Sequence, residues 1–474
     1  FGVLSKKQFR IAIMKYVSTR GKAPELNFEE AMLTGLARDG GLYVPEEYPL
    51  LSVQQISSFS TKSYEEVAFE IMKPFIGDTF SDDEFKRIIK TAYSGFSHRA
   101  KCPMVQLSEN HFLLELFHGP TLAFKDVAMQ LIGQMFEAAL KRRGEKVTIV
   151  GATSGDTGSA AMEAFKGLDS VDLFIMYPHG RVSEVQRRQM TTPQETNVHA
   201  LAVDGDFDTC QALLKDMFND FDFRDEVRLA GVNSINWARV LAQVVYYFTS
   251  AVAIGAPNRK VSFSVPTGNF GDIFAGYVAK KMGLPIDRLI IATNQNDILH
   301  RTVKTGNHTK SEVKPSISPS MDIQVSSNFE RLIFDLYQRD GSKVTELFDA
   351  LKNDGTFTLS NEANKQLINE FDSGCCSDIE TIQAIKKYHR SMGEILCPHS
   401  AIGVSVSEDQ MGKSPMITLA TAHPAKFPDA VQKACGVIPD LPSHMADLYD
   451  RDERMTRVPG DLNALEAIIR KGIK

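Results

Sequence analysis

His118–Asp126 is the first segment that could do chemistry. It contains Lys125, which follows three apolar residues. An apolar helical pattern comes directly after it. A lysine held among Leu, Ala and Phe side chains loses hydration, which lowers the pKa of its amine and suits it to form a Schiff base. Most lysines near the start of a helix are solvated, so Lys125 taken alone does not establish a site.

A second segment, Gly151-Ala152-Thr153-Ser154-Gly155-Asp156-Thr157-Gly158, stands between a predicted strand and a predicted helix. Small hydroxyl residues and exposed backbone N–H groups at a helix N-terminus form an anion site, aided by the helix dipole. The Gly-Lys-Ser/Thr ending of a nucleotide-binding P-loop is absent. Asp156 is unusual for simple anion binding. By itself the segment fits a glycine-rich helix cap equally well.

A third segment, Val265–Asp272, again joins a predicted strand to a predicted helix. Gly268 and Gly271 let the backbone approach a phosphate closely, and Asn269 tolerates the left-handed conformation. One Gly-x-x-Gly turn is weak evidence. Two such loops and a lysine loop in one chain, without a dinucleotide fingerprint, indicate a ligand site much more strongly.

These loops must be positioned by short apolar strands that alternate with amphipathic helices. Such runs occur at 147–150, 173–176, 261–265 and 416–420. Continuous apolar strands between helices indicate parallel sheets covered on both faces. Ligands bind such folds at the carboxyl ends of the strands, where the three loops stand.

The chain divides by character into an N-terminal part and an α/β core. Charged, helical periodicity marks residues 14–98, which we predict to be a mainly helical domain, and 99–474 form the core. Within the core we expect a small subdomain at about 105–200 and a large subdomain in the rest, with an insertion at about 300–400. Residues 1–13, basic and without acids, are interpreted as an extension or a leader remnant.

Composition excludes several classes of protein. The net charge of −6 provides no basic field for nucleic acid. No apolar stretch is long enough to span a membrane. The six cysteines form no Cys-x-x-Cys pair and the eleven histidines are scattered, so we expect no metal and a reducing, cytoplasmic location. No obligate protein partner is readable.

The three loops, in this order, resemble those of the threonine synthase family, which are pyridoxal 5′-phosphate (PLP) enzymes of fold type II. The resemblance rests on Phe117–Asp126, Thr153–Gly158 and Gly268–Asp272. Further phrases that resemble the family extend over nearly the whole chain beyond residue 13, at 36–45, 233–236, 320–323 and 421–427. One departure is Cys397, where the family would lead us to expect Asp. The resemblance implies two subdomains based on parallel sheets, together with an N-terminal helical domain.

The resemblance also implies roles for individual residues. Lys125 would carry PLP as a Schiff base, and a hydroxyl from Thr421 would meet the pyridine nitrogen. The substrate phosphate would need basic groups, for which Arg181 and Arg239 are candidates. The cofactor phosphate would lie in the loop Gly268, Asn269, Phe270, Gly271 and Asp272, and the substrate carboxylate in the loop Thr153, Ser154, Gly155, Asp156 and Thr157.

The implied reaction is loss of phosphate from O-phospho-L-homoserine, followed by addition of water, which gives L-threonine. Three alternatives stay open: a phospho-lyase that releases 2-oxobutyrate, a serine/threonine dehydratase, and a non-catalytic PLP-binding relative. The intact Lys125 opposes the last, and Asp156 opposes the dehydratase.

Overall fold

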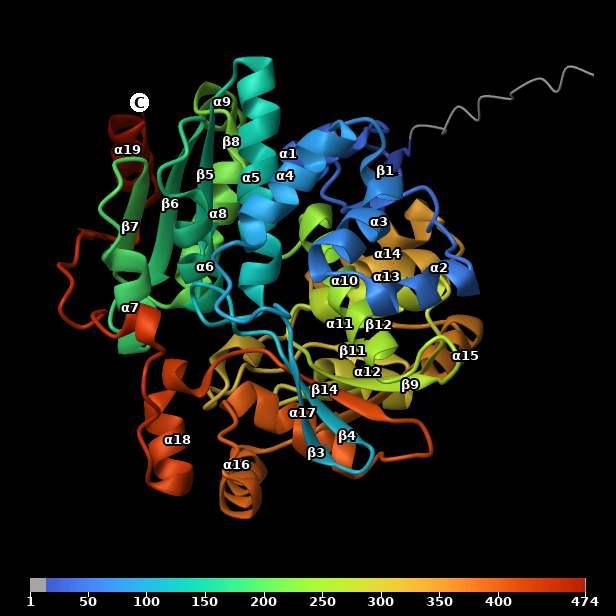
Figure 1. Ribbon diagram of the computed structural model, residues 1–474. Helices are drawn as coiled ribbons and strands as arrows, with labels where there is room; N and C mark the ends of the chain where they lie inside the picture. The colour runs from blue at the N-terminus through green and yellow to red at the C-terminus, as the bar shows by residue number, and fades with distance from the viewer. Residues whose placement is uncertain (1–13, 474) are drawn as a thin grey trace, which may run out of the picture.

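Two parallel sheets organise the molecule, which the computed structural model describes over residues 14–473 (Figure 1). The predicted extension at 1–13 lies outside these residues. The larger sheet has six strands in the order β13-β10-β9-β14-β4-β3, and only β3 is antiparallel to its neighbour. The bounds are β3 Met104–Ser108, β4 His111–Glu115, β9 Val261–Pro266, β10 Ile286–Thr293, β13 Phe371–Cys375 and β14 Met416–Ala420.

The smaller sheet has five strands, all parallel, in the order β15-β7-β6-β5-β8. Every residue of β6 is buried, as expected of a strand covered on both faces. The bounds are β5 Val147–Ala152, β6 Val171–Pro178, β7 Val198–Val203, β8 Leu229–Ala230 and β15 Thr456–Val458. The four strands predicted from apolar runs are therefore confirmed as β5, β6, β9 and β14.

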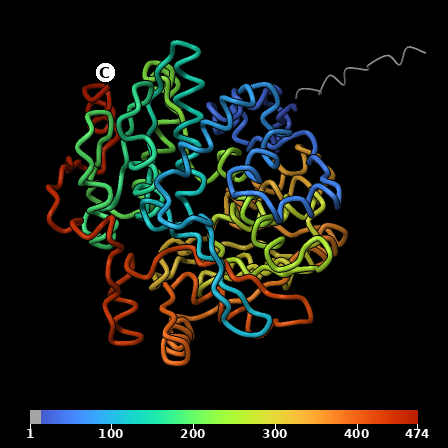
Figure 2. The backbone as a smooth tube through the Cα atoms, viewed as in Figure 1, coloured from blue at the N-terminus to red at the C-terminus, as the bar shows by residue number. Residues whose placement is uncertain are grey.

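The smaller sheet does not coincide with the subdomain predicted at about 105–200. Strands β3 and β4 belong to the larger sheet, because β4 pairs with β14 in the register His111↔Met416. The smaller sheet instead gains β8 and the C-terminal β15. Figure 2 shows the red C-terminal segment returning beside the green β7. Pairings between strands this far apart in the chain leave no local signal in the sequence.

Helices cover both sheets, and α10 lies deepest. Fifteen of its residues are buried, so it is apolar on nearly every side. Helix α5 packs between α6 on one side and α4 and α10 on the other. The bounds of the core helices are α5 Lys125–Arg143, α6 Asp156–Phe165, α7 Glu184–Thr191, α8 Phe207–Asn219, α9 Phe221–Glu226, α10 Trp237–Ala253, α11 Gly271–Lys281, α17 Pro398–Glu408, η3 Pro424–Lys426, α18 Pro428–Cys435, η4 Ser443–Met445 and α19 Leu462–Gly472.

The N-terminal segment is mainly helical and shares one hydrophobic core with the large subdomain. The Arg331 guanidinium donates to the carbonyl oxygen of Tyr43, and the Thr19 hydroxyl donates to Glu330 at 2.6 Å. The segment therefore packs as part of the core. Its elements are β1 Tyr16–Ser18, α1 Phe28–Thr34, β2 Tyr43–Pro45, α2 Val53–Ser58, η1 Phe59–Thr61, α3 Tyr64–Ile76 and α4 Asp82–Tyr93.

The region predicted as an insertion, about 300–400, is mostly helical and adds β13 to the edge of the larger sheet. Its elements are α12 Ile298–Thr305, β11 Asn307–Thr309, η2 Pro319–Met321, α13 Phe329–Leu336, α14 Gly341–Asn353, β12 Thr356–Thr358, α15 Asn361–Glu370 and α16 Asp378–Met392. Over residues 14–473, no helix combines the length and apolar character that a membrane span requires.

Candidate active site

Lys125 is the first residue of α5, and its side chain points into a cavity between the two sheet systems. Its amine lies 3.3 Å from Asp156 Oδ2 and 5.0 Å from the centre of the Phe124 ring. The side chain is only 11% exposed, and burial lowers the pKa of the amine, as predicted from its apolar neighbours. A larger share of the amine is therefore unprotonated and nucleophilic near neutral pH.

Asp156 begins α6 and is held from three sides. Its Oδ1 lies 2.9 Å from the amine of Lys426 and accepts a hydrogen bond from the Gln186 side chain at 2.9 Å. Burial would raise the pKa of Asp156, but Lys426 and Lys125 together lower it well below its ordinary range. The carboxylate is therefore ionised in the protein.

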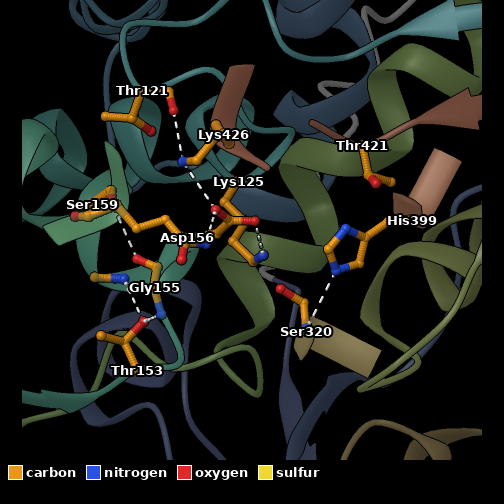
Figure 3. A network of polar contacts seen from close by, with 12 residues as sticks. Thr121, Lys125, Thr153, Gly155, Asp156, Ser159, Ser320, His399, Thr421 and Lys426 are labelled. Atoms are coloured by element: carbon orange, nitrogen blue, oxygen red, sulfur yellow. Dashed lines mark hydrogen bonds and ion pairs between the residues drawn. The ribbon is translucent and has the colours of Figure 1, made fainter. Parts of the chain in front are cut away.

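Lys426 has no surface exposure, and its amine also donates to the Thr121 carbonyl oxygen at 2.8 Å. Figure 3 shows the Lys426 amine between Thr121 and Asp156, with the Lys125 amine at the other oxygen of Asp156. Sequence reasoning placed Lys426 within a phrase that resembles the family but gave it no role. The available signal was a lysine between Ala425 and Phe427, shortly after β14.

The loop Gly268–Asp272 lines the opposite wall of the cavity. Phe270 adopts a left-handed conformation (φ +63°), which turns the chain into α11 at Gly271. The carbonyl oxygen of Gly268 accepts a hydrogen bond from the Ser326 hydroxyl at 2.6 Å, and that of Asn269 accepts one from the Asn328 backbone. The N–H groups at the start of α11 have no intrahelical acceptor and are therefore available to an anion.

Within this loop, the Asp272 side chain is not placed to bind an anion. Its Oδ1 accepts hydrogen bonds from the hydroxyls of Tyr246 and Tyr247. Its Oδ2 is buried and has no hydrogen-bond partner among the described residues. Burial raises the pKa of Asp272 to about 7. Any contact of Asp272 with a phosphate is therefore made by its backbone rather than by its carboxyl group.

The two candidate arginines lie in different environments. Arg239, on α10, is 3% exposed and lines the cavity. Its Nη1 donates to the Val232 carbonyl oxygen at 3.2 Å, its Nε has no partner, and residues 14–473 supply no carboxylate within ion-pair distance. Arg181 is exposed in the turn after β6 and does not line the cavity. The structure thus brings only Arg239 to the site.

The loop after β5 contributes Asp156 and Thr157 to the cavity. Thr153 is turned inward instead, because its hydroxyl accepts the N–H groups of Gly155 and Gly158, each at 2.9 Å. Gly155 has φ +133°, and a Cβ there would come within 2.3 Å of the Gln186 side chain. Ser154 and Gly155 do not line the cavity. The Thr153 side chain thus holds the loop in shape, and the N–H groups that remain for a ligand lie at the start of α6.

Thr421 follows β14 and lines the cavity. Its N–H donates to the Ser400 hydroxyl at 3.2 Å, and its carbonyl oxygen accepts the Phe124 N–H at 2.8 Å. Cys397 is the N-cap of α17, where its sulfur accepts the Ser400 N–H at 3.4 Å. The cysteine therefore occupies a capping position, the kind of position that Asp also fills.

His399 is a cavity residue that sequence reasoning missed. Its Nε2 accepts the Ser320 N–H at 3.3 Å, which leaves the proton on Nδ1. Nδ1 is buried without a partner in the described part of the chain, and burial lowers the pKa of His399 to about 4. His399 is therefore a neutral donor. Its only signal in the sequence was a histidine two residues after Cys397.

The residues that line the cavity fit PLP. A Cβ at Gly268 would lie 2.6 Å from the Ser320 carbonyl oxygen, so this wall admits only a glycine. The open N–H groups of α11 suit a phosphate, and the partly desolvated amine of Lys125 suits an aldehyde. Among the described residues, no group of three His, Cys, Asp or Glu side chains is placed to hold a metal, and all six cysteines are free.

Three family models match successive parts of the chain. They are described as threonine synthase N terminus (residues 15–93), pyridoxal-phosphate dependent enzyme (98–350) and threonine synthase, C-terminal (400–469). The threonine synthase of Pseudomonas aeruginosa is 53% identical over 459 residues, which cover 96% of this chain and 98% of that protein.

Solved structures agree with these matches. A PLP-bound threonine synthase from Brucella melitensis has a TM-score of 0.94 and 56% identity, covering 97% of this chain and 99% of that one. Yeast threonine synthase has a TM-score of 0.91 and 41% identity, with coverages of 97% and 99%. These matches cover nearly the whole chain and lead to one conclusion. The chain belongs to the threonine synthase family, the fold-type II lyases that use PLP as their cofactor.

Proposed function

We propose that this protein converts O-phospho-L-homoserine and water to L-threonine and phosphate. The observation that carries the proposal is a cavity with two separate positions suited to phosphate groups. One lies at the start of α11 and suits the cofactor phosphate. The other is the buried, unpaired cation of Arg239, which is left for the phosphate of a substrate.

The residues that would hold PLP come from both sheet systems. Lys125 binds its aldehyde carbon, the backbone of Gly268–Asp272 binds its phosphate, and Thr421 meets the ring nitrogen. When bound, PLP supplies an electron sink that stabilises negative charge at the α-carbon of the substrate. A hydroxyl partner such as Thr421 stabilises a protonated ring far less than a carboxylate would, which favours a neutral ring.

Substrate binding falls to groups on the cavity wall. The N–H groups at the start of α6, beside Asp156 and Thr157, would bind the substrate carboxylate. Arg239 would bind the leaving phosphate, since a guanidinium fork matches phosphate oxygens. His399 also lines the cavity, and its Nδ1–H is a buried donor without a partner among the described residues. Arg181 is given no part in this arrangement.

Proton transfer falls to Lys125. Once the substrate amine has taken the place of the Lys125 amine, the Lys125 amine is free inside the cavity. It can then reach the neighbouring α- and β-carbons of the substrate in turn. Its lowered pKa suits it to act as a base near neutral pH. Asp156, ionised beside it, stabilises the protonated form of the amine.

Product analysis tests the proposal directly. Purified protein incubated with O-phospho-L-homoserine should release L-threonine and phosphate in equal amounts, measured by chromatography and a phosphate assay. Release of 2-oxobutyrate would identify the phospho-lyase alternative, and no phosphate release would identify a non-catalytic relative. Borohydride reduction followed by peptide mapping should place the cofactor on Lys125, and a label on another lysine contradicts the site.

The substrate is a small molecule, and the proposal includes no nucleic acid and no protein partner. We also propose a cytoplasmic location, which rests on the six free cysteines. Fractionation of cells that express a tagged chain would test it.

A further inference from the structure

The two lysines that contact Asp156 differ in what they face. Lys125 contacts Oδ2 and lines the cavity, where cofactor and substrate react. Lys426 contacts Oδ1 at 2.9 Å, has no exposed surface and does not line the cavity. The carboxylate thus has one counter-ion that meets the reactants and one that is enclosed by protein.

Only one of these counter-ions can be permanent. Lys125 must give up its proton to attack an aldehyde or to act as a base. A buried carboxylate that loses its only cation becomes strongly unfavourable. Without a second cation, Asp156 would therefore oppose each step in which Lys125 releases a proton.

We propose that Lys426 is a positioning residue: it is the fixed counter-ion of Asp156, so that Lys125 can gain and lose its proton without leaving a buried charge unpaired. This inference rests on the proposed role of Lys125. The Thr121 carbonyl oxygen, 2.8 Å from Nζ, orients the Lys426 amine towards Asp156.

No other charged group near the site can replace Lys426. Gln186 contacts the same oxygen of Asp156 but carries no charge. On α5, Asp126 faces Lys426 but accepts hydrogen bonds from the backbone N–H and hydroxyl of Thr121. The remaining titratable groups that face the two lysines are Arg239 of α10, Asp272 of α11 and His399 of α17, none of which forms an ion pair with Asp156.

The test is the pH at which the full-length chain, freed of cofactor, captures added PLP. Capture is followed by absorbance and needs the unprotonated Lys125 amine. In Lys426→Met, Asp156 is left with Lys125 alone, so the amine keeps its proton to higher pH. We expect the midpoint of capture against pH to rise by about one unit or more. The acid limb of kcat/KM for O-phospho-L-homoserine should move in the same direction.

Two further variants separate charge from packing. Gln186→Met removes an uncharged donor from the same carboxylate oxygen and should leave the midpoint in place. Asp156→Asn combined with Lys426→Met removes both charges and should return the midpoint to that of the parent or below. If Lys426→Met does not fold, as judged by circular dichroism, Lys426→Gln removes the charge but retains a donor for Thr121.

An unchanged midpoint in a folded Lys426 variant would overturn the inference. So would a shift that persists in the double variant, because the carboxylate would then play no part in it. Capture needs no substrate, so these outcomes stand apart from the identity of the reaction. A parent chain that captures no PLP on Lys125 would instead contradict the proposed site.

Discussion

At the scale of single residues, the site holds one buried charge that residues 14–473 do not neutralise. Arg239 has no ion-pair partner in residues 14–473, and burial lowers the pKa of its guanidinium to about 10. Such a cation is unfavourable in the free protein. An anionic ligand that pairs with Arg239 would relieve this cost.

The first prediction concerns the two arginines. Arg239→Met should lower kcat/KM for O-phospho-L-homoserine by roughly 100- to 1,000-fold, which is a loss of about 2.7–4 kcal/mol for one electrostatic contact in a transition state. Arg181→Ala changes an exposed side chain and is the matched control, with kcat/KM close to the parent value. Steady-state kinetics at low substrate concentration measures both values. Equal kcat/KM values in the two variants would show that the substrate phosphate binds elsewhere.

The second prediction concerns Asp272, whose pKa is raised to about 7 by burial. The folded protein holds this proton more tightly than the unfolded chain does. The stability that Asp272 contributes is therefore full below about pH 4 and is lost as the pH rises to about 7. The free energy of unfolding of Asp272→Asn, taken relative to that of the parent, should therefore increase as the pH rises from 4.5 to 7.5. Urea titration measures this difference. A constant difference between the two proteins would show that Asp272 does not titrate in this range.

At the scale of elements, helix starts position most of the site. Lys125 begins α5, Asp156 begins α6 and Gly271 begins α11. Cys397 caps α17, which carries His399. We predict that Cys397→Ala lowers the free energy of unfolding by about 1 kcal/mol, the usual cost of a lost N-cap, whereas Cys397→Ser retains it. Chemical denaturation of both variants tests this, and equal losses would mean that the sulfur acts through packing alone.

The glycine loop gives the fourth prediction. A Cβ at Gly268 would lie 2.6 Å from the Ser320 carbonyl oxygen, so Gly268→Ala must displace the loop from its place in the cavity. Retention of PLP during dialysis, measured by absorbance, should fall at least tenfold. Gly412→Ala is the control, since open space surrounds a Cβ there. Similar retention in the two variants would exclude this loop as the phosphate cradle.

The sequence predicts those parts of the site that are local in the chain. The apolar strand before Gly151 and the glycines around Asn269 can be read directly, because strand, turn and helix start follow one another. Lys426 and His399 could not be assigned a role, since their function depends on meeting Asp156 and Ser320 across more than 75 residues of chain. The same reason explains why the sequence does not indicate that β4 belongs to the larger sheet, because the pairing of β4 with β14 has no local signature.

At the scale of the whole molecule, the cavity joins the two sheet systems. Asp156 follows a strand of the smaller sheet and Gly268 follows a strand of the larger one, and both line the cavity. A ligand that contacts both sides binds only the folded arrangement. We expect PLP at a hundredfold excess over its dissociation constant to add about 2.7 kcal/mol to stability. Thermal melting against PLP concentration tests this, and the gain should shrink in Lys125→Ala.

Strands β14 and β15 stand late in the chain, and this has a consequence for folding during synthesis. Strand β14 is inserted between β9 and β4 in the larger sheet, and β15 closes the edge of the smaller one. A ribosome adding about 5–20 residues per second has therefore made most of the chain before either sheet can be completed. Throughout that interval the nascent chain exposes unpaired strand edges, which readily pair with other chains. This enzyme should consequently depend on chaperones that bind nascent chains. Its dependence should be stronger than that of a protein of equal size whose sheets are completed in the order in which their strands are synthesised.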